Sequence, residues 1–397
     1  MNLIFFDSAA IRVNLLPFTF TRPVADIRAG ILTIREKWEK RLGLSSSSSL
    51  TEEYLSARFP LVTGDVNLVV NGALLPDAAL DSVLLLMAEN ELLRKGDRVI
   101  GGRVSESHLE FVRQGNWERF TMHEYSGEVQ EIVNLWDIFT TAGREIANDM
   151  ELLTKDRASQ PISPSNHITG DPSRIFLEPG AVVECAYLNT KDGPIYIGRD
   201  SEVMEGSMIR GPFALGEHSQ VKMGAKIYGP TSFGPHCKVG GEVNNSVIFG
   251  YSSKAHDGFL GNSVLGEWCN LGADTNNSNL KNNYAEVKLW HYGKRSFVKT
   301  GLQFCGLIMG DHSKSGINTM FNTGTVVGVS ANIFGSGFPR NFIPSFSWGG
   351  AGGMTTYEVQ TAIETAKLVY ARRGKPFDDT DQQMFRDIFE LTRGNRG

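Results

Sequence analysis

The residues with the clearest chemical potential lie at positions 253–262, where the sequence reads Ser-Lys-Ala-His-Asp-Gly-Phe-Leu-Gly-Asn. An imidazole titrates near neutral pH, so His256 can accept a proton from a nucleophile and release it again. The segment breaks a repeat that is otherwise regular, and such a departure points to a functional site. We therefore take His256 as a candidate for proton transfer. The alternative is an ordinary histidine at a solvent-facing corner.

The repeat around this segment has a period of six. Hydrophobic residues recur at every sixth position from Ile197 to Val239, and mostly small residues follow each of them by four positions. A helix would repeat its apolar face at 3.6 residues and a half-buried strand at 2.0, so this period predicts short strands joined by corners in a solenoid. The aliphatic residue of each hexad, such as Ile227, is expected to point inward.

The hexads also indicate where the solenoid begins and where it is interrupted. It is predicted to start near Ile168, and a polar excursion covers residues 276–296. After Val239 the period slips. It resumes at Phe249 and Ala255, at Leu265 and Leu271, and then at Met309, Ser315, Phe321, Val327 and Ile333.

Length and composition limit the class of protein. A chain of 397 residues exceeds what one hydrophobic core usually serves, so at least two structural units are expected. The net charge of −5, without a basic run, argues against a nucleic-acid partner. No apolar run approaches the roughly 20 residues of a membrane span, and the first residues suggest a buried strand, so a soluble cytoplasmic protein is expected. The four cysteines lack a metal-ligand spacing and are predicted to be packing residues.

The distribution of apolar and polar residues divides the chain into four parts. Residues 1–153 mix buried strands, at 3–6 and 66–70, with helices, at 30–42 and 136–153, as α/β domains do. A polar linker at 154–166 precedes the solenoid at 167–345, and a helical tail fills 346–397. The first tail helix is predicted to open on a capping box at residues 355–358, and the tail is expected to cover an end of the solenoid.

Three further stretches carry a family resemblance. They are Ser253-Lys254-Ala255-His256, Leu271-Gly272-Ala273-Asp274-Thr275, and Asn283-Tyr284 ahead of Lys288. This pattern resembles the acetyltransferase half of the bifunctional N-acetylglucosamine-1-phosphate uridyltransferase/glucosamine-1-phosphate N-acetyltransferase family, over residues 197–335. The whole chain looks like a shorter variant, with a reduced nucleotidyltransferase-like domain in front. The resemblance implies a left-handed parallel β-helix and a homotrimer whose acyl-CoA sites lie between neighbouring β-helices.

The resemblance also assigns roles to residues of the second half. His256 would remove a proton from the sugar amine as it attacks the thioester of acetyl-CoA. Asn283, Tyr284 and Lys288 fall on positions that bind the sugar phosphate. Lys222 replaces an arginine that pairs with phosphate, which keeps the charge but loses bidentate geometry. The sequence departs from the family at residue 259, where a phenylalanine stands in place of a tyrosine.

The first domain matches its relatives less closely. Nucleotidyltransferases cradle the triphosphate in a glycine-rich turn after the first strand, and here Arg12 is in place while the glycines are absent. Arg22 and Arg28 belong to segments that resemble the family's basic-proline stretch, so all three arginines are predicted to contact phosphate. Ala73 stands where an aspartate supplies a Mg²⁺ ligand, and Asn134 matches a second metal position. UTP is the expected nucleotide, with Asp7 as the nearest replacement carboxylate.

Together these features predict acetyl-CoA-dependent N-acetyl transfer to glucosamine 1-phosphate, coupled to uridylyl transfer in UDP-N-acetylglucosamine synthesis. Two alternatives stay open. One is a non-catalytic scaffold that binds a sugar nucleotide. The other is a β-helix metal hydratase, because His218 and His236 lie one coil apart and should stack, although no third ligand is in register.

Overall fold

The computed structural model describes residues 2–396, which form two compact units. The first unit comprises residues 2–15, 21–27 and 32–134, and the second comprises residues 16–20, 28–31 and 135–396. Residues 135–153, at the end of the range predicted for the first domain, therefore lie in the second unit. Among the described residues, no helix combines the length and apolar character that crossing a bilayer requires.

The first unit is built on a six-stranded mixed sheet of order β2-β1-β3-β6-β5-β7. The predicted strands are confirmed as β1 and β3, which pair in parallel. The predicted helix at 30–42 is confirmed from residue 34 onward, because Thr33 caps its first turn together with Glu36. The elements are β1 (Asn2–Phe6), α1 (Ala9–Asn14), α2 (Ile34–Leu42), β2 (Ser48–Leu50), α3 (Glu53–Ser56), β3 (Val66–Asn71), β4 (Leu74–Leu75), α4 (Ala78–Leu86), β5 (Glu91–Lys95), β6 (Arg98–Ser105), α5 (Leu109–Gln114), β7 (Thr121–Glu124) and β8 (Gln130–Glu131).

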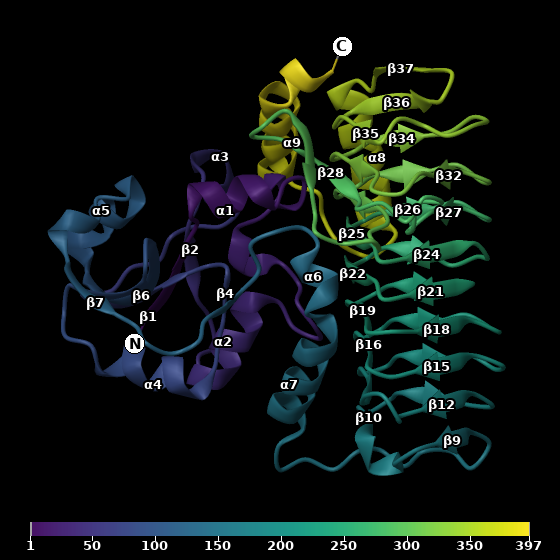
Figure 1. The fold of residues 1–397 in the computed structure, drawn as a ribbon, viewed down its shortest axis with the longest axis horizontal. Helices are drawn as coiled ribbons and strands as arrows, with labels where there is room; N and C mark the ends of the chain where they lie inside the picture. The colour runs from purple at the N-terminus through teal and green to yellow at the C-terminus, as the bar shows by residue number, and fades with distance from the viewer. Residues whose placement is uncertain (1, 397) are drawn as a thin grey trace. The chain divides into compact units, whose positions relative to one another are not determined.

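The second unit is a parallel β-solenoid, as the hexads predict (Figure 1). Each coil contributes one short strand to each of three sides. The first side contains β10 (Ile175–Leu177), β13 (Ile195–Ile197), β16 (Phe213–Leu215), β19 (Thr231–Phe233), β22 (Val247–Gly250), β25 (Val264–Glu267), β30 (Ile308–Met309), β33 (Val326–Val327) and β35 (Phe342–Ile343). The second contains β11 (Val182–Val183), β14 (Glu202–Val203), β17 (Gln220–Val221), β20 (Lys238–Val239), β23 (Ser253–Lys254), β26 (Asn270–Leu271), β31 (Lys314–Ser315), β34 (Asn332–Ile333), β36 (Ser347–Gly350) and β37 (Gly353–Thr356). The third contains β9 (His167–Thr169), β12 (Tyr187–Asn189), β15 (Met208–Arg210), β18 (Lys226–Tyr228), β21 (Glu242–Asn244) and β24 (Phe259–Gly261), followed by the pair β27 (Asn276–Asn277) and β32 (Met320–Phe321).

The strand register confirms most of the predicted inward positions and corrects one pair. Met309 and Val327 stack in one column, and Ser315 and Ile333 in another, as predicted. After Phe233, however, the inward residue is Ile248 and not Phe249. The prediction was wrong here because this coil has fifteen residues and not eighteen, which places each inward residue one position before the predicted one. The next inward residue is consequently Lys254 and not Ala255.

The three corners of the coil differ in composition. The aromatic corner, between the first and second sides, holds stacked rings in the left-handed backbone conformation, with φ between 53° and 62°: His218, His236, Tyr251, Trp268 and His312. The His256 corner lies between the second and third sides. The hairpin corner lies between the third and first sides, where the chain leaves the solenoid after β27 to form the antiparallel pair β28 (Lys288–His291) and β29 (Ser296–Lys299). The predicted polar excursion therefore carries a hairpin of its own.

Four helices accompany the solenoid: α6 (Asp137–Thr140), α7 (Ala142–Thr154), α8 (Val359–Ala371) and α9 (Asp379–Leu391). The two predicted tail helices are confirmed as α8 and α9, but the expected capping box is wrong because residues 355 and 356 belong to β37. The tail covers the aromatic corner and not the end of the solenoid, since Tyr370 stacks on Trp268 at 4.0 Å and Phe385 meets the edge of His312 at 4.8 Å. At that end, β37 pairs antiparallel with β36.

Candidate functional site

His256 lies at an exposed turn between β23 and β24, where the chain passes from the second to the third side. Its main-chain carbonyl oxygen accepts a hydrogen bond of 2.6 Å from the Nζ atom of Lys254. Gly258 follows in the left-handed conformation, with φ of 111°. The backbone of this turn is thus held from the inside of the solenoid, while the imidazole stays open to solvent and to a substrate.

Lys254 is the residue that sequence reasoning missed. It takes the inward position that Val239 holds in the preceding coil, and only 2% of its surface is exposed. A second hydrogen bond, of 3.0 Å, joins its Nζ atom to the carbonyl oxygen of Gly240. Burial lowers the pKa of Lys254 to about 8, against the opposing effect of Asp257 and Asp274. The signal was present in the sequence, since a lysine stands one position before the assumed hexad residue.

Lys222 lies on the same corner as His256, two coils away. Its backbone N–H donates to Val239, and its Nζ atom donates to the side-chain oxygen of Gln220 at 2.8 Å. Neighbouring parallel strands are about 4.7–4.9 Å apart, which separates the two corner positions by about 10 Å along the solenoid. Gly240 stands between them, and a Cβ atom there would come within 2.5 Å of a main-chain oxygen and 3.0 Å of the Lys222 Cβ atom. The corner therefore has no room for a side chain at residue 240. It carries two candidate groups, the side chains of Lys222 and His256.

Asn283, Tyr284 and Lys288 lie on the hairpin corner. The Asn283 side chain accepts a hydrogen bond of 3.1 Å from the N–H of residue 285, which shapes the local turn. Tyr284 has a positive φ of 57° and is 66% exposed. Lys288 is exposed at the start of β28. The three residues thus lie on one corner, and within one chain this corner differs from that of His256 and Lys222.

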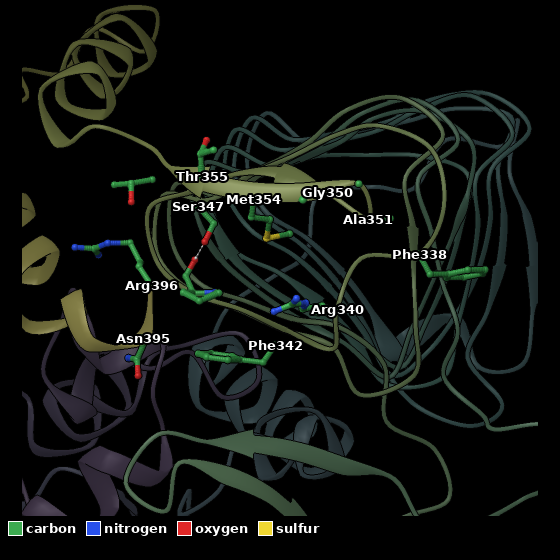
Figure 2. A pocket seen from close by; sticks show the side chains of 14 residues that line it. Phe338, Arg340, Phe342, Ser347, Gly350, Ala351, Met354, Thr355, Asn395 and Arg396 are labelled. Atoms are coloured by element: carbon green, nitrogen blue, oxygen red, sulfur yellow. Dashed lines mark hydrogen bonds between the residues drawn. The ribbon is translucent and has the colours of Figure 1, made fainter.

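The hairpin corner also contains a cavity of about 600 Å³ that the sequence did not reveal. The cavity combines three cationic side chains with aromatic rings and two small polar groups. The lining residues are Lys281, Lys288, Trp290, Phe297, Thr323, Arg340, Asn341 and Phe342. We call it the basic aromatic pocket. A second cavity, of about 730 Å³, shares Arg340 and Phe342 with it and extends toward β36 and β37 (Figure 2).

In the first unit, the predicted phosphate-binding arginine is paired with protein groups. The guanidinium of Arg12 donates to the carboxylate of Asp7 at 2.9 Å and to the hydroxyl of Tyr54 at 2.9 Å. The hydroxyl of Thr51 donates to the same carboxylate oxygen, Oδ2, at 2.6 Å. The Oδ1 atom of Asp7 accepts from the N–H of Val24 at 2.9 Å. Burial raises the pKa of Asp7, and the charge of Arg12 opposes that shift. We call this arrangement the Asp7–Arg12 cluster.

The other residues predicted for the nucleotide site are spread over both units. Arg22 is buried, and its carbonyl oxygen accepts from Arg12 at 3.3 Å. Arg28 belongs to the second unit, where its guanidinium donates to the carbonyl oxygens of Phe249, at 2.9 Å, and Ile31. Asn134 is half-buried just beyond β8. All three predicted phosphate-binding arginines are therefore buried, and the guanidinium groups of Arg12 and Arg28 donate hydrogen bonds to protein groups.

Comparison with known proteins gives a match between a family model and the first part of the chain. Residues 3–158 match the family model described as sugar nucleotidyl transferase. This range contains the β1–β3 sheet, the Asp7–Arg12 cluster and the predicted metal positions. Residues 3–158 are therefore similar to sugar nucleotidyl transferases, and we refer to this similarity when we call them the sugar nucleotidyl transferase domain.

Two relatives match parts of the chain. A bifunctional sugar-1-phosphate nucleotidylyltransferase/acetyltransferase of Sulfurisphaera tokodaii is 36% identical over 144 residues, which are 36% of this chain and 35% of the relative. The bifunctional protein GlmU of Methanocaldococcus jannaschii is 36% identical over 87 residues, or 22% and 21% of the two chains. The chain thus covers well under two thirds of the relatives it matches. Their names confirm the predicted resemblance.

Among solved structures, the chain is similar to the polySia-specific acetyltransferase NeuO. The identity is 13%, and the match covers 53% of this chain and 99% of that one with a TM-score of 0.28.

The side chains of the sugar nucleotidyl transferase domain do not fit the Mg²⁺ ion that the resemblance suggests. Mg²⁺ binds carboxylate and other oxygen ligands. Both oxygens of Asp7 already accept hydrogen bonds, and Ala73 has no side-chain oxygen to offer. A backbone hydrogen bond of 2.9 Å from Ile132 to Ala73 brings the two predicted metal segments together, but without a carboxylate between them. Between residues 2 and 396, no cluster of three or more His, Cys, Asp or Glu side chains could hold a metal.

The histidine pair of the solenoid stacks as predicted. The rings of His218 and His236 lie 4.9 Å apart at an angle of 19°, and His236 continues the stack onto Tyr251 at 4.7 Å. Burial lowers the pKa of His236, and the neighbouring His218 and Arg373 act in the same direction. This corner is an aromatic ladder in contact with the tail, so the observed role of the pair is packing.

Proposed function

We propose that the protein is an acetyl-CoA-dependent N-acetyltransferase that acts on an amino-sugar phosphate, with glucosamine 1-phosphate as the substrate. The observation that carries this proposal is the His256 turn. An exposed imidazole stands on a corner whose backbone is fixed from within by Lys254. The sequence match to relatives named as nucleotidylyltransferase/acetyltransferases supports the same activity.

In the proposed reaction, the amine nitrogen of the sugar attacks the carbonyl carbon of the thioester. His256 accepts a proton from that nitrogen as the C–N bond forms. The C–S bond then breaks, the sulfur of CoA leaves with the electron pair and is protonated, and the amide remains on the sugar. Lys222 and Lys288 supply positive charge for the sugar phosphate, because a lysine ammonium binds phosphate as a point charge.

The proposal includes a homotrimer, since the candidate groups lie on two corners of one chain. In a trimer, the His256 corner of one protomer would face the hairpin corner of its neighbour. Two large apolar side chains on the His256 corner are exposed, Met223 at 70% and Ile317 at 71%. This exposure supports a neighbouring subunit that covers them. Exposed apolar groups of this size commonly mark interaction surfaces. The four cysteines are free in the structure, which agrees with a reducing compartment such as the cytoplasm.

For the sugar nucleotidyl transferase domain, we propose uridylyl transfer in the same biosynthesis of UDP-N-acetylglucosamine. A second candidate is a domain that binds a sugar nucleotide without turnover. The Asp7–Arg12 cluster favours this second candidate, because the groups that would hold a metal or a phosphate are already paired with each other.

The test is a pair of assays on the purified full chain. Acetyl-CoA and glucosamine 1-phosphate should give thiol release that depends on both substrates. Sugar 1-phosphates with each nucleoside triphosphate should reveal any pyrophosphate release. Folded protein that releases no thiol with any amino-sugar phosphate would contradict the acetyltransferase proposal. Pyrophosphate release at an ordinary rate of roughly 10 s⁻¹ would contradict the non-catalytic candidate.

A further inference from the structure

The loop between α8 and α9, residues 372–378, packs on the aromatic corner of the solenoid, and we call it the tail loop. The guanidinium of Arg373 donates through Nη2 to the carbonyl oxygen of His236 at 3.3 Å. The Nζ atom of Lys375 lies 5.0 Å from the ring centroid of Tyr251, which is a cation–π distance. Two cations of the tail loop are thus held at defined places on the solenoid.

A third cation meets them from the solenoid itself. Lys238 is half-buried on β20, on the outer face of the second side. Its neighbours in the strand register are Gln220 and Ser253, which carry no charge. Burial lowers the pKa of Lys238, and nearby positive charges, above all that of Arg373, act in the same direction. The charges that act on Lys238 are therefore all positive.

The carboxylates of this region do not neutralise the three cations. Asp378, the acid of the tail loop, caps α9 and accepts a hydrogen bond of 2.9 Å from a backbone N–H of that helix. Glu202, in the same outer column as Lys238, accepts a hydrogen bond of 3.0 Å from a glutamine of the neighbouring strand. Glu217 is exposed in the coil before the tail-loop contact. Over residues 2–396, no ion pair joins any of the three cations to a carboxylate.

The end of α8 accounts for only part of this arrangement. Arg372 and Arg373 directly follow the last residue of α8, where cations complement the partial negative charge of a helix C-terminus. Lys238 lies on a strand and Lys375 lies beyond the helix end, so this effect explains neither of them. Like charges that are close together and partly buried oppose each other's ionised state. An anion bound between them would remove this cost.

We propose that Lys238, Arg373 and Lys375 form a binding site for a phosphate-bearing anion between the tail loop and the second side. A guanidinium can bind two phosphate oxygens at once, and a lysine ammonium binds phosphate as a point charge. A diphosphate suits cations that come from two elements, because each phosphoryl group carries charge. It can be free pyrophosphate or the diphosphate of a nucleotide, which share this chemistry. None of the three residues takes part in the proposed acetyl transfer, so the two proposals can fail separately.

Such an anion would tie the tail to the solenoid. It would contact Lys238 on β20 and the two cations of the tail loop at the same time, so it would bind the docked loop and not the undocked one. A ligand of this kind lowers the undocked population by the factor 1 + [L]/Kd. Trypsin cleaves after Arg372 and Arg373, and cleavage of a transiently opened segment follows the population of the open form.

Calorimetric titration of the full chain with pyrophosphate, UDP and inorganic phosphate tests the site. Pyrophosphate should bind more tightly than phosphate, because it carries more charge. Lys238→Met and Lys375→Met should each weaken pyrophosphate binding by about 10-fold, since hydrogen bonds to charged groups contribute on that scale. Lys226→Met removes an exposed lysine on the third side and is the charge-matched control, which should bind like the wild type. Melting curves without ligand show that each variant is folded.

Limited digestion with trypsin gives a second measurement. With pyrophosphate at ten times its Kd, cleavage after Arg372 and Arg373 should slow about 10-fold in the wild type. Lys238→Met should show no such protection at the same concentration. Protection that is equal in the two proteins would contradict a site that joins the tail loop to β20.

The titrations with UDP distinguish the two sources of the diphosphate. Equal binding of UDP and pyrophosphate, weakened alike in both variants, would show that the site recognises the diphosphate alone. Tighter binding of UDP that both variants weaken would identify a nucleotide as the ligand. UDP binding that neither variant changes would count against a nucleotide at this site. Folded wild-type protein that binds no pyrophosphate, or variants that bind it like the wild type, would overturn the inference.

Discussion

The Asp7–Arg12 cluster and the basic aromatic pocket use the same kinds of residues in opposite ways. In the cluster, the cation lies 2.9 Å from a carboxylate and donates to Tyr54, with the Arg12 and Asp7 side chains buried. In the pocket, Arg340 and Lys288 line an open cavity beside aromatic rings, with no acid in the lining. A charge that the fold has already neutralised stabilises the fold and cannot also neutralise a ligand. The cations of the basic aromatic pocket are thus open to a ligand, whereas the guanidinium of Arg12 is already paired within the first unit.

The comparison assumes that the solenoid is a rigid scaffold, and Ile227→Asp tests that assumption with the largest expected effect. Ile227 lies in the core column of the third side and is fully enclosed. An unpaired carboxylate there has no water or partner, and repeat proteins couple each coil to its neighbours. We expect loss of the solenoid's circular dichroism signal or insoluble protein. Lys226→Ala, one position away on the outer face, should fold normally. A soluble Ile227→Asp variant with an unchanged melting temperature would show that the inward face is wrongly assigned.

Arg12→Ala and Arg340→Ala probe the contrast directly. Removing one partner of a buried ion pair typically costs about 3–5 kcal/mol, because the other charge is left uncompensated. Arg12→Ala should therefore destabilise the first unit by that amount, measured by urea denaturation. Arg340→Ala should change the free energy of unfolding by less than about 0.5 kcal/mol, as exposed sites usually do. Equal effects of the two substitutions would remove the distinction between a structural and a ligand-binding arginine.

His256→Ala sharpens the comparison at the level of catalysis. General-base catalysis contributes about 10²- to 10⁴-fold in rate, so we expect acetyl transfer to fall by at least about 100-fold. The side chain is exposed, and the turn is held through its backbone, so the melting temperature should stay the same. A variant that keeps most of its kcat would leave His256 as an ordinary corner residue and would direct attention to the hairpin corner.

The sequence predicted the solenoid well because its signal is repeated many times over. The columns through Leu215 and Phe233 follow directly from the period of six, and no single substitution can hide it. The one wrong pair, Phe249 and Ala255, follows from a coil shortened by three residues, which a strict period cannot anticipate. Only the folded chain shows that Lys254 replaces an aliphatic core residue.

The candidate site was predicted in part for a similar reason. A motif predicts His256, Asn283 and Lys288, because motifs are local in sequence, and their roles stay predictions. Arg340 was not, since it reaches the basic aromatic pocket from a coil more than forty residues further along the chain. The pairing of Arg12 with Asp7 and Tyr54 was also hidden, because charge composition does not state which charges meet.

The smallest expected effect concerns Lys254. Its buried amine is hydrogen-bonded to main-chain carbonyl oxygens, so it resembles neither Arg12, which pairs with a carboxylate, nor the open cations of the basic aromatic pocket. Burial lowers its pKa to about 8 in the folded protein, from 10.5. Between these two values the unfolded chain binds more protons than the folded one, so the free energy of unfolding should rise with pH. The difference in pKa corresponds to about 3 kcal/mol in the free energy of unfolding. This stabilisation is absent below pH 8, because the folded protein must then hold a buried ammonium. Lys254→Met should lack this rise.

The measurement is urea denaturation of the second unit at pH 7 and pH 10. Between pH 7 and pH 10, the free energy of unfolding of the wild type should rise by about 2–3 kcal/mol. That of Lys254→Met should not show this rise. Lys226→Met replaces an exposed lysine and should follow the wild-type pH dependence. The methionine cannot donate to the carbonyl oxygens of Gly240 and His256, so acetyl transfer should fall even at pH 7, where the variant is no less stable. A Lys254→Met protein with wild-type kcat would show that the amine only fills the core and does not position the His256 turn.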